Sequence, residues 1–116
     1  MIGTALVGFG WWGQHIARRL KGHTEFNLLC VVEPAEAMHG EIEAMGLTPL
    51  KTYEDALALP GVEAVILTSP NDLHDAQIAA AVDANIHVFC EKPLSLSAEN
   101  ARKSVEACRA AGLVLG

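Results

Sequence analysis

The chain has 116 residues, a formal net charge of −6 at pH 7 and 51% hydrophobic residues. A chain of this length is typical of one domain with one core, and this apolar fraction excludes a disordered chain. The acidic balance argues against nucleic-acid binding and against attraction to anionic membranes, because both need a basic surface.

Cysteine usage and the absence of long apolar runs indicate the compartment. The three cysteines form no Cys-x-x-Cys pair, which argues against a disulfide framework and against a zinc site. Cys30 and Cys90 lie in apolar runs and are expected to be core residues. No apolar run approaches the roughly 18 residues of a membrane span, and no signal peptide precedes the first run. We therefore expect a soluble cytoplasmic protein without a metal site.

Short apolar runs recur along the chain and predict the strands. The four strongest runs are Thr4–Val7, Phe26–Val32, Ala64–Leu67 and His87–Cys90. Weaker runs lie at Pro49–Leu50 and at Leu113–Leu115. The strong runs are continuous rather than alternating, which is typical of parallel strands that are covered on both faces.

Helical patterns separate these runs. The predicted helices cover His15–Leu20, Ala35–Met45, Tyr53–Leu59, Asp72–Ala84 and Ala98–Ala111. Thr52 and Ser97 are expected as N-caps, and the last helix is expected to bury Ala101, Val105 and Cys108. Strand and helix alternate with short connections, which predicts βαβ units in a doubly wound parallel sheet of α/β class with three α/β/α layers.

The first predicted strand runs into a glycine-rich loop, Gly-x-Gly-x-x-Gly, and a helix follows at once. In this context Gly8 permits a tight turn, Gly10 lets the backbone approach a diphosphate, and Gly13 lets the helix pack closely on the strand. The helix N-terminus then presents free amides to the phosphates. Two readings of Trp11 and Trp12 stay open: one ring covers the core while the other shields the loop, or one lies along the dinucleotide.

Glu33 ends the second predicted strand, 20 residues after Gly13 (33 − 13 = 20). This is where a dinucleotide-binding fold places the acid that accepts hydrogen bonds from the adenine ribose. A carboxylate there repels a 2′-phosphate, and no Arg or Lys occurs in the next four residues. The sequence therefore favours NAD over NADP.

Polar residues follow the fourth and fifth strands, at the edge where ligands bind in doubly wound sheets. The segment Ser69-Pro70-Asn71 is followed by His74, and Cys90-Glu91-Lys92-Pro93 directly follows a strand. Together with the glycine loop, these motifs resemble the Gfo/Idh/MocA family of NAD(P)-dependent oxidoreductases. The resemblance covers the chain from Ile2 to Gly116 and implies hydride transfer to or from a hydroxyl or carbonyl of sugars, cyclitols and related polyols.

The resemblance also implies roles for individual residues. The cofactor-binding positions are Gly8, Phe9, Gly10, Trp11, Trp12, Gly13, Glu33, Ser69, Asn71, His74, Glu91 and Lys92. Lys92 is the implied catalytic residue, bonded to the reacting oxygen. Hydride transfer needs a group that relays the hydroxyl proton and stabilises charge on oxygen, and a lysine whose pKa is lowered by burial can do both. The residues alone also allow Lys92 to be an exposed lysine at a strand end.

Members of this family continue into a second α/β domain that supplies most of the substrate pocket. The resemblance therefore implies that this 116-residue chain is the NAD(P)-binding domain without the C-terminal substrate domain. Positioning of the reactants can be worth roughly 7–11 kcal/mol, so we expect little turnover from the chain alone. We also expect self-association into a homo-oligomer through the apolar surface that the absent domain would cover.

Two alternatives remain open on the sequence. A non-catalytic module that senses NAD(H) or mediates an interaction would share the glycine loop and Glu33 but would not need Lys92. A methyltransferase is disfavoured by the Gly-x-Gly-x-x-Gly spacing and by the Lys92-Pro93 element.

Overall fold

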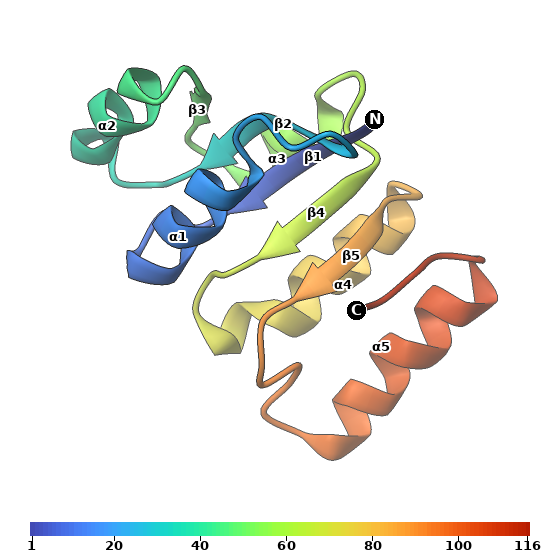
Figure 1. Ribbon diagram of the computed structural model, residues 1–116. Helices are drawn as coiled ribbons and strands as arrows, with labels where there is room; N and C mark the ends of the chain where they lie inside the picture. The colour runs from blue at the N-terminus through green and yellow to red at the C-terminus, as the bar shows by residue number, and fades with distance from the viewer.

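The computed structural model describes all 116 residues and contains one parallel sheet of five strands in the order β3-β2-β1-β4-β5 (Figure 1). The strands are β1 (Ile2–Val7), β2 (Phe26–Val32), β3 (Thr48–Leu50), β4 (Ala64–Leu67) and β5 (His87–Cys90). Every adjacent pair is parallel. The predicted parallel α/β sheet is confirmed, and each of its strands coincides with an apolar run of the sequence.

The helices lie between the strands. They are α1 (Trp11–Leu20), α2 (His39–Ala44), α3 (Tyr53–Ala58), α4 (His74–Asp83) and α5 (Ala98–Ala110), with 3₁₀ turns at Glu36–Met38 and Asn71–Leu73. The hydroxyls of Thr52 and Ser97 accept the predicted capping bonds, at 3.2 Å in each case. Helix α1 begins at Trp11, four residues earlier than predicted. The polarity of the residues does not show whether the two tryptophans belong to the loop or to the first helical turn.

The core has two parts, one on each face of the sheet. On one face α1 and α2 pack on β1 and β2, with Leu6, Val31 and Ile42 fully buried. On the other face α3, α4 and α5 pack on the sheet, and Leu50 of the short β3 is partly buried against this cluster. The molecule therefore has the predicted three layers, with the sheet in the middle.

The strand order reverses at β1, and this positions the cleft. From β1 the chain proceeds outward to β2 and β3, then crosses back to β4 and β5 on the other side of β1. Val7 pairs with Val32 of β2 and with Leu67 of β4, so three strands end side by side. In such sheets ligands bind outside the carboxyl ends of the strands at the reversal point.

One part of the sheet is not covered on both faces, contrary to the prediction. Phe89 of β5 is 51% exposed and Val114 is 66% exposed, on the face that carries α1. A largely apolar hollow of about 380 Å³ lies there over β4 and β5. In Figure 1 this face of β4 and β5 has no helix in front of it. The continuous apolar run reports the hydrophobicity of both faces, not whether an element of this chain covers them.

Two further predictions need correction. The run at Leu113–Leu115 forms only an isolated bridge, in which Leu115 pairs with Val88, rather than a strand. Val105 of α5 is 37% exposed, whereas Cys108 is buried as expected.

None of the helices combines the length and apolarity needed to cross a membrane. No group of three or more His, Cys, Asp or Glu side chains is arranged to hold a metal ion.

Candidate functional site

A cleft of about 550 Å³ lies at the carboxyl ends of β1, β2, β3 and β4. Five of the predicted cofactor-binding residues line it: Gly8, Phe9, Gly10, Glu33 and Ser69. The other seven predicted residues do not line this cleft. The structure therefore brings the glycine loop, the acid after β2 and the loop after β4 together, as the sheet topology requires.

The glycine loop turns from β1 into α1 through two positions where only glycine fits. Gly8 has a φ of +103°, and a Cβ there would lie 2.8 Å from the hydroxyl oxygen of Thr68. A Cβ on Gly13 would overlap the carbonyl oxygen of Gly8. These two glycines are explained by the protein itself, because they let α1 approach the end of β1.

Gly10 is different, because nothing in the protein requires a glycine there. Its backbone is extended (φ −72°, ψ −170°), and a Cβ would have no heavy atom within 4 Å. Gly10 is the N-cap of α1, and no side chain caps this helix. Uncapped amides at a helix N-terminus attract anions, and the bare Gly10 backbone allows a diphosphate to approach. The geometry therefore fits the diphosphate of a dinucleotide.

The carboxylate of Glu33 is tied to the glycine loop. Its Oε1 accepts a hydrogen bond from the backbone N–H of Phe9 at 3.3 Å, and its Oε2 accepts one from Ala35 at 2.9 Å. His39 Nε2 lies 2.7 Å from the backbone carbonyl oxygen of Glu33. The side chain of Phe9 is 2% exposed and belongs to the core, so only its backbone faces the cleft.

The tryptophans do not cover the core, since Trp11 is 74% exposed and Trp12 47% exposed. Their ring centroids lie 6.0 Å apart at an interplanar angle of 29°. The indole N–H of Trp12 donates a hydrogen bond of 2.7 Å to Glu91 Oε2. This bond joins the first turn of α1 to the segment after β5, and it is a contact that sequence reasoning missed.

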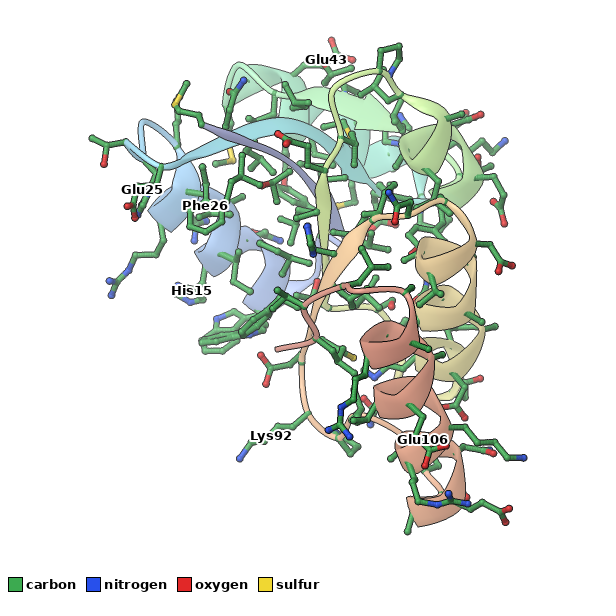
Figure 2. All side chains as sticks on the ribbon, turned by 90° about the vertical axis from the view of Figure 1, so that its right-hand side faces the viewer. His15, Glu25, Phe26, Glu43, Lys92 and Glu106 are labelled. Atoms are coloured by element: carbon green, nitrogen blue, oxygen red, sulfur yellow. The ribbon has the colours of Figure 1, made fainter.

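The remaining predicted residues follow β4 and β5. Lys92 is exposed, and Figure 2 shows its side chain extending away from the ribbon into open space. The burial expected for this lysine is therefore not present in the chain. Asn71 is also exposed, the hydroxyl of Ser69 donates to Oε1 of Gln77, and His74 is fully buried beneath both loops.

Several residues of the cleft were not singled out in the sequence. Lys51 follows β3, lines the cleft near Glu33, and pairs with Glu36 at 3.1 Å. Burial raises the pKa of the Tyr53 hydroxyl, which donates to the carbonyl oxygen of Gln77 at 2.7 Å. The apolar run before Lys51 is short and weak, so the sequence did not show that Lys51 follows a strand at the edge of the sheet.

The buried thiols are not chemically activated. Burial raises the pKa of Cys30 from its ordinary value of 9.0 to about 11. The pKa of Cys90 is also raised to about 11, first by burial and then by the charges of Glu91 and Asp75. Thiolates are the reactive form of cysteine, so neither residue is a nucleophile near neutral pH.

Comparison with known proteins identifies relatives of the whole chain. Residues 2–116 match the family described as "Oxidoreductase family, NAD-binding Rossmann fold". The chain is 35% identical over 116 residues to the 2,7-anhydro-N-acetylneuraminate hydratase of Escherichia coli, covering 97% of this chain and 30% of that protein. It is 38% identical over 107 residues to an inositol 2-dehydrogenase of Agrobacterium fabrum, covering 88% and 32%. The chain thus spans about a third of the length of these relatives.

Solved structures give the same result. GenD2 from gentamicin A biosynthesis, in complex with NAD, superposes with a TM-score of 0.93 at 31% identity, covering 99% of this chain and 33% of that one. The biliverdin reductase of Synechocystis, in complex with biliverdin and NADP⁺, has a TM-score of 0.92 at 26% identity, covering 98% and 36%. Because these neighbours hold different dinucleotides, the comparison supports NAD(P) binding without choosing between the two.

Proposed function

The chain belongs to the oxidoreductase family with an NAD-binding Rossmann fold, and from this premise we propose that residues 1–116 form the cofactor-binding half of an NAD-dependent oxidoreductase. Its reaction transfers a hydride between nicotinamide and a hydroxyl-bearing carbon of a sugar, cyclitol or polyol. The names of the two relatives above refer to a sugar acid and a cyclitol, which supports this substrate class.

Gly10 is the observation that carries the proposal. The protein supplies no steric reason for a glycine at this position, whereas a diphosphate lying against the N-terminus of α1 does. In the proposed complex the amides that open α1, including those of Trp11 and Trp12, donate to the diphosphate. Glu33 then accepts hydrogen bonds from the hydroxyls of the adenine ribose.

The preference for NAD rests on the charge at the ribose end of the cleft. Glu33 repels a 2′-phosphate, but Lys51 lines the same cleft and would attract one. Glu36 partly neutralises Lys51 through their 3.1 Å contact, so the balance favours NAD. Both side chains are well exposed, so this ion pair contributes only weakly to the preference for NAD.

Lys92 is the proposed catalytic residue. When bound, the nicotinamide ring supplies the hydride acceptor or donor. The ammonium of Lys92 is proposed to hydrogen-bond to the reacting oxygen, where it stabilises developing negative charge and takes part in relaying the hydroxyl proton. The carboxylate of Glu91 accepts hydrogen bonds from the Lys92 backbone N–H, at 3.2 Å, and from the Trp12 indole N–H. The second bond holds this segment near the first turn of α1.

A second candidate function is a non-catalytic NAD(H)-binding or sensing module. It is favoured by one observation, the exposure of Lys92, whose side chain reaches into solvent rather than into the cleft (Figure 2). A lysine can stabilise the charge on a reacting oxygen only when the substrate is held beside it.

The experiment is a calorimetric titration of the chain with NADH, NADPH and S-adenosylmethionine. We expect binding of NADH, weaker binding of NADPH and none of S-adenosylmethionine. Glu36→Gln should raise the affinity for NADPH relative to NADH by freeing Lys51. Equal affinity for the two dinucleotides in the unmodified chain would contradict the NAD preference, and preferential binding of S-adenosylmethionine would overturn the proposed function.

A second measurement separates the enzyme from the sensor. NAD and excess polyol are added, and the absorbance of the reduced nicotinamide is followed over hours. We expect a very slow signal that Lys92→Met abolishes without changing NADH affinity more than about twofold. Rapid turnover would show that the substrate site is complete, and a signal that is absent or unaffected by Lys92→Met would favour the sensing module.

A further inference from the structure

The ring of His74 lies between the two loops that follow β4 and β5. His74 is the first residue of α4 and its side chain has no exposed surface. Nδ1 lies 2.9 Å from the carbonyl oxygen of Pro93, and Nε2 lies 3.1 Å from the carbonyl oxygen of Ser69. One loop carries Ser69 and the other carries Lys92, so a single side chain contacts both.

The partners of the ring are two acceptors. A carbonyl oxygen only accepts, so each contact requires an N–H on the imidazole. A neutral ring carries one N–H and serves one carbonyl at a time, whereas a protonated ring serves both. Without the ring at least one of these carbonyls loses its donor, which is unfavourable where the carbonyl is shielded from water.

No other side chain hydrogen-bonds to both loops. The hydroxyl of Ser69 bonds to Gln77 within its own half of the cleft, and Glu91 bonds to Trp12 of α1. The two loops otherwise meet through the backbone at the strand ends, where the N–H of Glu91 donates to Leu67 at 2.9 Å. Beyond that point the imidazole makes the only hydrogen bonds between the two loops.

We propose that His74 is a positioning residue that sets the distance between the Ser69 loop and the Lys92 loop, and so shapes the nicotinamide end of the cleft without touching the dinucleotide. This inference rests on the proposed function, because it assigns His74 an effect on one end of a bound dinucleotide. It differs from the implication of the family resemblance, which places His74 beside the cofactor. Its fully buried ring, with both nitrogens engaged, supports an indirect role.

The proposal predicts an effect that differs along the ligand. Gly10 and Glu33 belong to the β1–β2 side of the cleft, and neither forms a hydrogen bond with His74. A change at His74 should therefore weaken binding of a ligand that reaches the Lys92 loop and spare one that ends at the diphosphate. A purely structural role would weaken binding of both ligands alike.

The test compares NADH with ADP, which carries the adenosine and the diphosphate but no nicotinamide. Affinities are measured by calorimetry for the unmodified chain, His74→Leu and His74→Gln, with His23→Gln as the control because His23 is exposed at the far end of α1. We expect His74→Leu to weaken NADH binding at least about fivefold and to leave ADP binding within about twofold. We expect His74→Gln to recover part of the loss, since its amide donates to at least one carbonyl.

Amide spectra provide a readout that does not depend on affinity. In His74→Gln the backbone resonances of Ser69, Glu91 and Lys92 should shift, while those of Gly10 and Phe9 should not. If His74→Leu fails to fold, the Gln variant carries both measurements.

The outcomes separate the two claims. Equal loss of NADH and ADP affinity, or no loss of either, overturns the positioning role while leaving the proposed function in place. Failure of the unmodified chain to bind either ligand overturns the proposed function and this inference with it.

Discussion

The two sides of the cleft are built differently. On the β1–β2 side, the backbone N–H of Gly8 donates to Val32 at 2.9 Å, and the carboxylate of Glu33 accepts from the glycine loop. On the β4–β5 side, Lys92 is exposed and Glu91 is held by a side-chain bond to the exposed Trp12. Backbone bonds join the neighbouring strands on both sides, but beyond the strand end the second side is held by side chains of α1 and α4, namely Trp12 and His74. We therefore expect the first side to be ordered without ligand and the second to depend on what binds.

The largest effect is expected from filling the space between α1 and the end of β1 with a side chain. In Gly13→Val the new side chain overlaps the carbonyl oxygen of Gly8, so α1 cannot pack in place. We expect a loss of more than about 3 kcal/mol in the free energy of unfolding, or no folded protein. Chemical denaturation followed by circular dichroism measures this. A variant as stable as the unmodified chain would contradict the close approach of α1.

Gly10→Ala is the matched change in the same loop. Because a Cβ at position 10 meets no atom of the protein, stability should fall by at most about 1 kcal/mol, the cost of losing a favourable N-cap residue. NADH affinity should fall about tenfold or more, equivalent to roughly 1.4 kcal/mol, because the methyl group occupies the diphosphate position. Calorimetry measures the second effect. Unchanged affinity would remove the main support for the proposed diphosphate site.

The thiols on the two sides allow a comparison by pH. Cys30 lies in β2 and Cys90 ends β5, and the pKa of each is raised to about 11 in the folded chain. Both thiols ionise near pH 9 when unfolded, so their contribution to stability is complete below pH 9 and is lost as the pH rises through 11. Urea denaturation at pH 8, 9, 10 and 11 should show this fall. Constant stability over that range would contradict the burial of these thiols.

Alkylation kinetics sharpen the same comparison. At pH 8.5 iodoacetamide should modify Cys90 faster than Cys30, because Cys90 lies at the end of β5, on the β4–β5 side. Cys90 is 8% exposed and Cys30 is fully buried. Peptide mass spectrometry at timed intervals gives both rates. Equal rates would indicate that the two sides open together.

The smallest effect is expected from the bond between α1 and the segment after β5. Trp12→Phe retains an aromatic ring but removes the 2.7 Å bond to Glu91. Since both groups are partly solvated, NADH affinity should fall only by roughly two- to fivefold. ADP affinity should not change, which calorimetry can test. Loss of ADP affinity would place the ring of Trp12 against the diphosphate instead.

The sequence predicted local features well because each depends on neighbouring residues. Strand runs, the glycine loop and the position of Glu33 follow from hydrophobic pattern and spacing along one βαβ unit. The bond between Trp12 and Glu91 joins residues 79 positions apart, and no local pattern reports it. Lys51 was missed for a related reason, because a strand of three residues carries little signal.

The sequence predicted an uncovered apolar surface but not where on the sheet it lies. Phe89 lies in an apolar run, which predicts a strand but not its exposure. The predicted homo-oligomer formed through this surface is still a prediction. Sedimentation of Phe89→Ser against the unmodified chain tests it, with a shift toward monomer as the expected result.

The chain contains two tryptophans, and both open helix α1 beside the proposed diphosphate position. Indole emission overlaps the absorption band of a reduced nicotinamide but not that of the oxidised ring. Excitation energy can therefore pass from these rings to bound NADH and not to bound NAD⁺. If the dinucleotide binds as proposed, tryptophan emission would report its redox form without an external label.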